Sequence, residues 1–349
     1  MISYMKNLDK KINLGIVGCG RISLKHINAI SSSFLKNKIK LRAVCDKDIS
    51  KTKAISKKYK INAYQNMIDM VRKEKLDMVS ILTESGYHHK HFLKLSKYVK
   101  FFVIEKPLSL KTKNSLNIFE IAKKNKNKIF VVKQNRFNPA IIKLKEAIKQ
   151  NRFGKIFLGT ARVRWCRDQN YYNLAPWRGT HDLDGGVIGN QASHHVDMLN
   201  WLIGEIECVS ALGIKALVKI ESFDTVIVNL KFKSGAIGVI EATTASRPND
   251  LEGSISILGS KGSVVIGGFS MNLIDTWKFS KNVKKDTEIF KYSSKPKSVY
   301  GHGHVGFYKS VIESLKSKKI IHPANAMHTV KVIEAINKSV MLKGKTIYL

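Results

Sequence analysis

Two side chains in this sequence are of a type and placement that could move a proton. Lys106 lies between Glu105 and Pro107 at the end of an apolar run, and His194 lies in the string NQASHHVD. A lysine at the carboxyl end of a parallel strand, partly desolvated and near a positive charge, has a lowered pKa and can act as a general acid or base. The alternative for Lys106 is a solvated lysine, because lysine occurs throughout the chain.

The segment around His194 carries several polar groups on one predicted helix. Asn190, His194 and Asp197 share a face through spacings of four and three residues. Two adjacent histidines cannot both point at one ligand, and no HExxH motif occurs, so we predict no metal site. The alternative is a capped helix with a histidine in the core.

A glycine turn follows the first apolar run. Gly18-Cys19-Gly20-Arg21-Ile22-Ser23 matches the dinucleotide fingerprint, with a small serine in the third conserved place. Asp46 ends the next strand, where a carboxylate binds ribose hydroxyls and repels a 2′-phosphate. The pattern therefore favours NAD over NADP, although Lys47 next to Asp46 weakens that preference. A glycine turn of some other α/β protein is the alternative.

Arginine is scarce but locally concentrated. Five of the ten arginines fall in one stretch: Arg152, Arg162, Arg164, Arg167 and Arg178. Arg162 and Arg164 alternate along a predicted strand and share a face, and Arg178 follows Trp177. Such a group is typical of bidentate recognition of carboxylate or phosphate. Surface ion pairs are the alternative.

The elements that must position these residues differ between the two halves of the chain. In the first half, predicted strands at 12–18, 41–46, 77–83, 101–107 and 129–135 alternate with helices at 22–30, 51–59, 89–98 and 112–125. This alternation predicts an α/β fold with a doubly wound parallel sheet of the Rossmann type.

The second half is rich in β-structure. After a helix at 139–150, strands are predicted at 155–165, 207–218, 224–232, 236–245, 254–259 and 263–268, with helices at 191–203, 303–317 and 324–342. Short turns between many of the strands predict a large, mostly antiparallel sheet in an α+β domain. We therefore expect an NAD(P)-binding domain at 1–135 and a substrate-binding and oligomerisation domain at 136–349.

Composition narrows the class of protein. The 349 residues carry a net charge of +35, yet nearly all the excess is lysine spread along the chain, which indicates compositional drift and not a nucleic-acid interface. No apolar stretch is long enough to span a membrane, and the first residues lack an apolar signal-peptide core. The four cysteines are scattered without a CxxC pair. We expect a cytoplasmic protein that binds neither nucleic acid nor membrane.

Four motifs in order identify a resemblance. GIVGCG, AVCDKD, the IEKP strand end and the GG…N…H..D helix together resemble the Gfo/Idh/MocA family of sugar oxidoreductases, across essentially the whole chain. The resemblance implies that Lys106 and His194 are catalytic. Where the family usually has Asp, this chain has Asn190, which argues against the inositol-dehydrogenase type of proton relay. The string WRGT…DGG…NQASHHVD looks like the branch that oxidises UDP-N-acetylglucosaminuronate at C3, although His181 follows RGT where an aromatic residue is usual.

The resemblance and the residues together give one expected activity. We expect NAD-dependent oxidation of a sugar secondary alcohol, C3 of a UDP-activated amino-sugar uronate, in surface polysaccharide biosynthesis. The expected cofactor-binding residues are Gly18, Gly20, Arg21, Ile22, Asp46, Thr83, His88, Glu105 and Lys106. The expected substrate-binding residues are Arg162, Arg164, Trp177, Arg178, Asn190 and His194. The alternatives are a dehydrogenase of a free polyol or hexose and a non-catalytic NAD-binding sensor. The family also implies a homo-oligomer, a dimer or tetramer.

Overall fold

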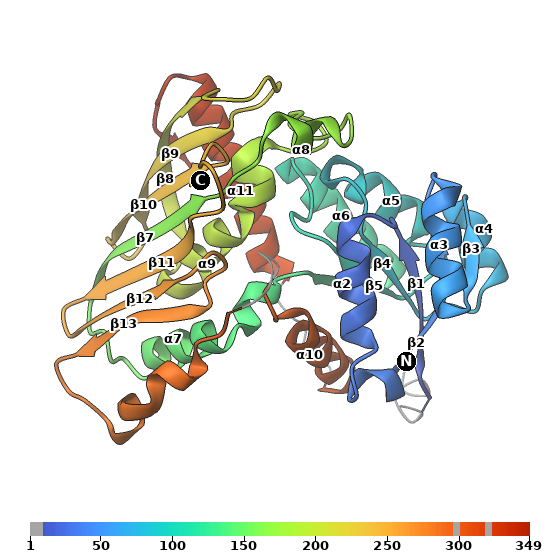
Figure 1. Cartoon of the computed structure of the whole chain (residues 1–349), viewed down its shortest axis with the longest axis horizontal. Coiled ribbons are helices and arrows are strands. Elements are labelled where there is room, and N and C mark those ends of the chain that lie inside the picture. Colours follow the sequence, from blue (N-terminus) through green and yellow to red (C-terminus); the bar gives the residue numbers. More distant parts are fainter. Residues whose placement is uncertain (1–9, 296–300, 318–322) are drawn as a thin grey trace. The chain divides into compact units, whose positions relative to one another are not determined.

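The chain folds into two compact units. The computed structural model describes residues 10–295, 301–317 and 323–349 (Figure 1). The first unit comprises Met1–Val132 with His304–Met327, and the second comprises Lys133–Gly303 with His328–Leu349. The division after Val132 lies near the expected boundary at 135. The segment from His304 returns to the first unit, however, so the second unit is not the single stretch 136–349. Within the described residues, no helix has the length and apolarity needed to cross a membrane.

The first unit is built on a parallel six-stranded sheet of order β3-β2-β1-β4-β5-β6, as the alternating pattern predicts. Its strands are β1 (Ile12–Val17), β2 (Ile39–Cys45), β3 (Asn62–Tyr64), β4 (Met78–Ile81), β5 (Phe101–Ile104) and β6 (Lys128–Val131). Its helices are α2 (Arg21–Ile30), α3 (Ile49–Tyr59), α4 (Met67–Lys73), α5 (His88–Leu95), α6 (Thr112–Asn125) and α10 (His304–Ser317). Short β3 and α4 were not expected. The strand order reverses between β1 and β4, which is where such sheets bind ligands.

The prediction of a strand over 129–135 is wrong in its second half. Strand β6 ends at Val131, and a short 3-10 helix follows over Gln134–Phe137. Gln134, Asn135 and Arg136 are buried although they are polar. The Gln134 and Arg136 side chains bond to His194 and Asp197, about 60 positions away, and periodicity could not reveal these bonds.

The second unit is built on an eight-stranded sheet of order β13-β12-β11-β7-β10-β9-β8-β14. Its strands are β7 (Ile156–Arg164), β8 (Ile206–Ile214), β9 (Thr225–Phe232), β10 (Ile237–Thr243), β11 (Glu252–Gly259), β12 (Gly262–Gly267), β13 (Leu273–Phe279) and β14 (Ile347–Tyr348). Helices α7 (Pro139–Lys149), α8 (Gln169–Asn173) and α9 (Ser193–Ile203) belong to this unit, and α11 (Pro323–Met341) reaches into it. All pairings are antiparallel except that of β7 with β10, which confirms the predicted mostly antiparallel sheet.

The two faces of this sheet differ. Figure 1 shows α9 and α11 along one face, and Gly159 on β7 allows α9 to approach, since a Cβ there would lie 2.1 Å from Ile203 Cδ1. The buried side chains of α9, α11 and the sheet form one hydrophobic core on that face. The opposite face exposes apolar side chains on three adjacent strands, namely Leu212, Ile214, Ile227 and Ile237. We refer to this surface as the open face.

Candidate active site

The glycine turn between β1 and α2 leaves room for a ligand. Gly18 has φ +99°, and a Cβ there would lie 2.6 Å from the Leu82 carbonyl oxygen, so only glycine fits. Gly20 has an ordinary φ of −73° and no atom within 4 Å of a built Cβ. Neither strain nor a protein neighbour therefore requires glycine at position 20. The open space beside Gly20 and the uncapped N-terminus of α2 are features that a pyrophosphate site requires.

Ser23, in the third fingerprint position, is fully buried and donates a hydrogen bond to the Gly20 carbonyl at 2.7 Å. Ser23 therefore stabilises the glycine turn through a hydrogen bond inside the turn itself. Arg21 and Ile22, which open the helix, are exposed and half-buried respectively.

Asp46 is fixed beside the same turn. Its Oδ2 accepts the Cys19 N–H at 2.7 Å, and its Oδ1 accepts the Asp48 N–H at 2.9 Å. The neighbouring Lys47 pairs with Glu84 at 3.4 Å. A carboxylate held at this strand end suits ribose hydroxyls, and Lys47 is directed toward another acid.

The ends of β4 and β5 are tied together through a histidine. His88 is fully buried, with Nδ1 at 2.9 Å from the Pro107 carbonyl and Nε2 at 3.0 Å from the Thr83 carbonyl. Burial lowers the pKa of His88. Thr83 Oγ1 lies 2.9 Å from His91 Nδ1. A neutral His88 ring donates to one of these two carbonyls, which follow β4 and β5, and the Pro107 carbonyl directly follows Lys106.

Glu105 is buried and remains ionised. Its Oε1 lies 2.8 Å from His26 Nε2, and its Oε2 accepts the Lys106 N–H at 2.9 Å. Burial alone would raise the pKa of Glu105, but the hydrogen bond and the charge interaction with His26 outweigh it and lower the pKa to about 2. Glu105 therefore holds the backbone of Lys106 in place through this hydrogen bond.

The second unit gathers another group of polar side chains at the start of α9. A π-helical turn over Val187–Gln191 precedes α9 and carries Asn190. Asn190 Nδ2 donates to Asp184 Oδ1, and Asp184 Oδ2 accepts the Gly179 N–H at 3.0 Å. Asp184 is buried and thereby joins Asn190 to the loop that carries Trp177 and Arg178.

Arg178 is stacked between aromatic rings in that loop. Its guanidinium carbon lies 4.3 Å from the Tyr171 ring centre and 4.7 Å from the Trp177 ring centre. The structure thus brings Trp177, Arg178 and Asn190 together through Asp184, a residue that the sequence argument did not select. The DGG motif was the only signal for it.

His194 is held by a glutamine far away in the sequence. The Gln134 amide nitrogen lies 2.8 Å from His194 Nε2, and both side chains are buried. An amide nitrogen only donates, so Nε2 accepts, and a neutral ring carries its proton on Nδ1. His195 is fully buried against the Trp165 ring, and burial lowers its pKa to about 3.

A buried ion cluster fixes α9 one turn after His194. Asp197 accepts two bonds from Arg136, each of 2.8 Å, and pairs with Lys133 at 2.9 Å. Thr329 Oγ1 donates to it at 3.1 Å. Burial would raise the pKa of Asp197, but Arg136 and Lys133 lower it far below its usual range. Sequence analysis placed Asp197 on the helix but did not find its partners.

Arg162 and Arg164 lie elsewhere. They project from the open face of the sheet, whereas α9 packs on the opposite face of β7. Arg164 pairs with Glu241 at 2.5 Å and with Glu252 at 3.2 Å, and Arg162 lies 3.9 and 3.6 Å from the same two acids. Within one chain, the structure therefore does not bring these arginines together with Asn190 and His194.

Comparisons with known proteins cover both units. Residues 12–133 match the oxidoreductase family model with an NAD-binding Rossmann fold, and residues 141–265 match the GFO/IDH/MocA C-terminal domain model. The structure is similar to the WlbA dehydrogenase from Chromobacterium violaceum in complex with NADH and UDP-GlcNAcA, with 36% identity, a TM-score of 0.91 and coverage of 98% of this chain and 96% of that chain. The corresponding Bordetella pertussis complex gives 35% identity, a TM-score of 0.93 and 98% coverage of both chains.

A curated relative is named for a substrate other than the UDP-GlcNAcA bound in these two structures. Myo-inositol 2-dehydrogenase of Thermotoga maritima is 27% identical over 261 residues, which are 72% of this chain and 74% of that protein.

Proposed function

Because the chain belongs to the Gfo/Idh/MocA family of NAD-dependent oxidoreductases, we propose that it oxidises the C3 hydroxyl of UDP-N-acetylglucosaminuronate or a close nucleotide-sugar acid. One observation carries this choice of substrate. The two WlbA dehydrogenases, which were solved with NADH and UDP-GlcNAcA, are 35 and 36% identical to this chain and match 98% of it. Surface polysaccharide biosynthesis, which consumes such sugars, is the proposed setting.

The proposed chemistry is the removal of a hydride and a proton from one carbinol group. Lys106, as the neutral amine, takes the hydroxyl proton while the C3 hydride leaves, so that the alcohol becomes a ketone. NAD, held by the residues of the glycine turn, would supply the hydride acceptor. His194 hydrogen-bonds the same hydroxyl and holds it in line, and Asn190 contacts the sugar as a neutral group. General acid-base catalysis of this kind contributes about 10²- to 10⁴-fold.

The cofactor is assigned to the glycine turn and the strand ends beside it. Gly18, Gly20, Arg21 and Ile22 take the pyrophosphate, and Asp46 takes the adenosine ribose. Thr83 lies at the end of β4, on the carboxyl edge of the sheet. We assign His88 and Glu105 to holding this edge, since their polar atoms bond to nearby backbone groups and to His26.

For the acidic groups of the substrate, Arg178 is the preferred residue. It is stacked on Trp177 in the loop that Asp184 joins to Asn190. A guanidinium held between rings presents its planar edge to a carboxylate or diphosphate. Arg162 and Arg164 already pair with acidic side chains on the open face. Within one chain, they are therefore less suited than Arg178 to bind the acidic groups of the substrate.

The open face supports the proposal of a homo-oligomer. Leu212, Ile214, Ile227 and Ile237 are between 53 and 64% exposed on adjacent strands, beside the Arg–Glu pairs. Leu212 and Ile227 face each other across β8 and β9, and Ile237 lies farther along the sheet, opposite Lys231. Exposed apolar side chains gathered on one face of a sheet mark an interface. We propose a second copy of the chain as the partner. The Ile227→Lys, Ile237→Lys double variant should shift the mass measured by light scattering to that of the monomer. An unchanged mass would exclude this face.

The substrate is tested by spectroscopy. Purified protein is mixed with UDP-N-acetylglucosaminuronate, the nicotinamide absorbance is followed, and the protein is then denatured to release bound cofactor. UDP-N-acetylglucosamine, which lacks the carboxylate, is the matched control, with myo-inositol and glucose beside it. We expect NADH with the uronate alone. Turnover of inositol or glucose would favour the polyol alternative, consistent with the inositol dehydrogenase relative. NAD binding without turnover of any sugar would favour the sensor.

A further inference from the structure

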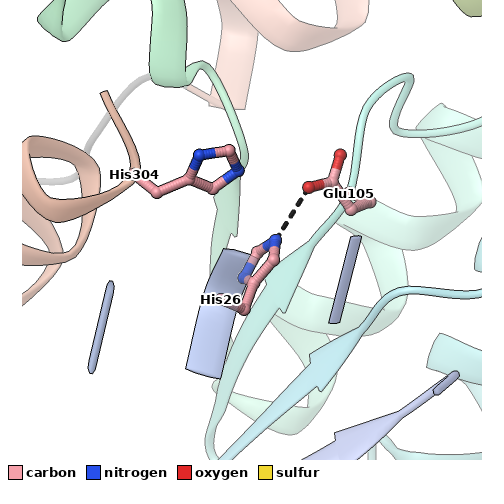
Figure 2. A group of neighbouring side chains, drawn as sticks. All are labelled: His26, Glu105 and His304. Atoms are coloured by element: carbon pink, nitrogen blue, oxygen red, sulfur yellow. Dashed lines mark hydrogen bonds and ion pairs between the residues drawn. The ribbon is translucent and has the colours of Figure 1, made fainter. Parts of the chain in front are cut away.

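Three potential metal ligands converge inside the first unit. The ligand atoms of His26, Glu105 and His304 lie within 4.8 Å of one another, and all three side chains are buried (Figure 2). They come from α2, the residue after β5 and the start of α10. Neither the cofactor turn nor the proposed chemistry uses His26 or His304 directly.

Hydrogen bonds extend this group further into the unit. His26 Nε2 lies 2.8 Å from Glu105 Oε1, and His26 Nδ1 lies 2.8 Å from the Tyr308 hydroxyl. The Tyr308 hydroxyl lies 3.1 Å from Ser80 Oγ on β4. Since Glu105 is ionised, His26 Nε2 donates to Glu105, and the Tyr308 hydroxyl links His26 Nδ1 to Ser80.

The geometry argues against a metal ion. A metal ligated by His26 Nε2 would have to replace its bond to Glu105, and the other nitrogen of His26 already has a partner. Of the three side chains in this group, His304 alone has a buried ring nitrogen, Nε2, without a hydrogen-bond partner among the described residues.

The chain of bonds is also not a route for protons to solvent. His26, Tyr308 and Ser80 each have 0% exposure, and the chain ends inside the sheet at Ser80. Its other end is Glu105, whose second oxygen holds the Lys106 N–H at 2.9 Å. What remains for the chain to do is to fix the position of Lys106.

We propose that His26 and Tyr308 are positioning residues for Lys106, which they hold in place by orienting the Glu105 carboxylate that bonds the lysine backbone. Helix α10 supplies Tyr308 from 202 residues beyond Lys106 in the sequence, so the first unit needs this late segment to complete its active-site edge. The inference rests on the proposed role of Lys106 as the base.

The test compares four variants in the full-length protein. His26→Leu removes both bonds, Tyr308→Phe removes one, and His26→Gln retains an N–H donor for Glu105. Ile27→Ala, a buried neighbour on α2, is the control for general loosening of the helix. The readouts are kcat, KM and NAD affinity with UDP-N-acetylglucosaminuronate. Hydrogen exchange at the Lys106 amide is also measured, because it does not depend on turnover.

We expect His26→Leu to lower kcat on the order of 10- to 100-fold while KM and NAD affinity change by less than about two-fold. It should also speed exchange of the Lys106 amide. Tyr308→Phe should give a smaller loss, and His26→Gln should recover most of the activity. If kcat and exchange change no more than in Ile27→Ala, the proposal is wrong.

Two further outcomes separate this proposal from its neighbours. One equivalent of bound metal in the purified protein, lost in His26→Leu, would overturn the positioning role in favour of a metal site. If the wild type oxidises no sugar but the amide exchange responds as expected, the proposed function fails while the positioning of Lys106 stands.

Discussion

The two halves of the candidate site are fixed in different ways. In the first unit, the glycine turn is held mainly by backbone geometry and short contacts, and Asp46 bonds N–H groups within 27 positions of itself. In the second unit, His194 depends on Gln134, 60 positions away, and Asp197 depends on Arg136, 61 positions away. Local geometry therefore forms the glycine turn of the first unit, whereas long-range polar contacts hold Glu105 beside Lys106 in the first unit and His194 and Asp197 in the second.

The sharpest test of the first half is removal of the lysine amine. Lys106→Met should reduce turnover by about 10³-fold, because it removes the amine proposed to take the hydroxyl proton, while NAD affinity is retained. Stopped-flow measurement of NADH formation and calorimetric titration of NAD provide the two readouts. Lys113→Met, at an exposed position of α6, is the control and should leave both unchanged. Loss of NAD binding in Lys106→Met would assign the lysine to the cofactor instead.

The second half should respond most strongly in stability. Asp197→Asn leaves Lys133 and Arg136 buried without their counter-charge, which should lower the free energy of unfolding by about 3 to 5 kcal/mol. Because the folded-state pKa of Asp197 is lowered, the stabilisation is present at neutral pH and is lost as the pH falls below about 4. Urea titration at several pH values measures both effects. A wild-type stability that is flat across this range would contradict the cluster.

A smaller effect is expected from loss of the hydrogen bond that orients His194. Gln134→Leu removes the bond to Nε2 and should lower kcat on the order of 10-fold, since the ring can then rotate. NAD affinity, which belongs to the other half, should not change. Gln150→Leu, an exposed glutamine at the end of α7, is the control. Equal effects of the two variants would show that the bond to His194 is unimportant.

Asp46 tests whether a single residue beside the glycine turn sets the preference for NAD over NADP. Asp46→Ser removes the charge that repels a 2′-phosphate, so the ratio of NADP to NAD efficiency should rise by about 10-fold or more. Asp48→Ser, which keeps a side chain able to cap α3, is the matched control and should leave the ratio unchanged. An unchanged ratio in Asp46→Ser would move the cofactor preference to other residues.

The smallest effect is expected at Arg164. Arg164→Ala should leave KM for the nucleotide sugar within about two-fold, because its guanidinium already pairs with Glu241 and Glu252. Arg178→Ala should raise the same KM by about 10-fold or more, as loss of a charge-assisted bond predicts. Steady-state kinetics on the two variants decides between them. A large KM effect in Arg164→Ala would place the open face at the substrate.

The sequence by itself determined the sheets, the cofactor turn and the family. Alternating apolar runs predicted the parallel and the mostly antiparallel sheet, and the GxGxxS turn with Asp46 predicted NAD, because these features depend on residues close together in the chain. The EKP lysine and the α9 histidine were predicted as catalytic from the same kind of local motif.

Only the tertiary structure decided what holds those residues. Gln134, His26 and Tyr308 carry no local motif, and their partners lie far away in the sequence. Alternation along β7 predicted that Arg162 and Arg164 project from the same face of the strand. It could not predict that α9 packs on the opposite face. Buried polar side chains obtain their partners from strands and helices that meet only after folding, which is why composition and spacing could not reveal them.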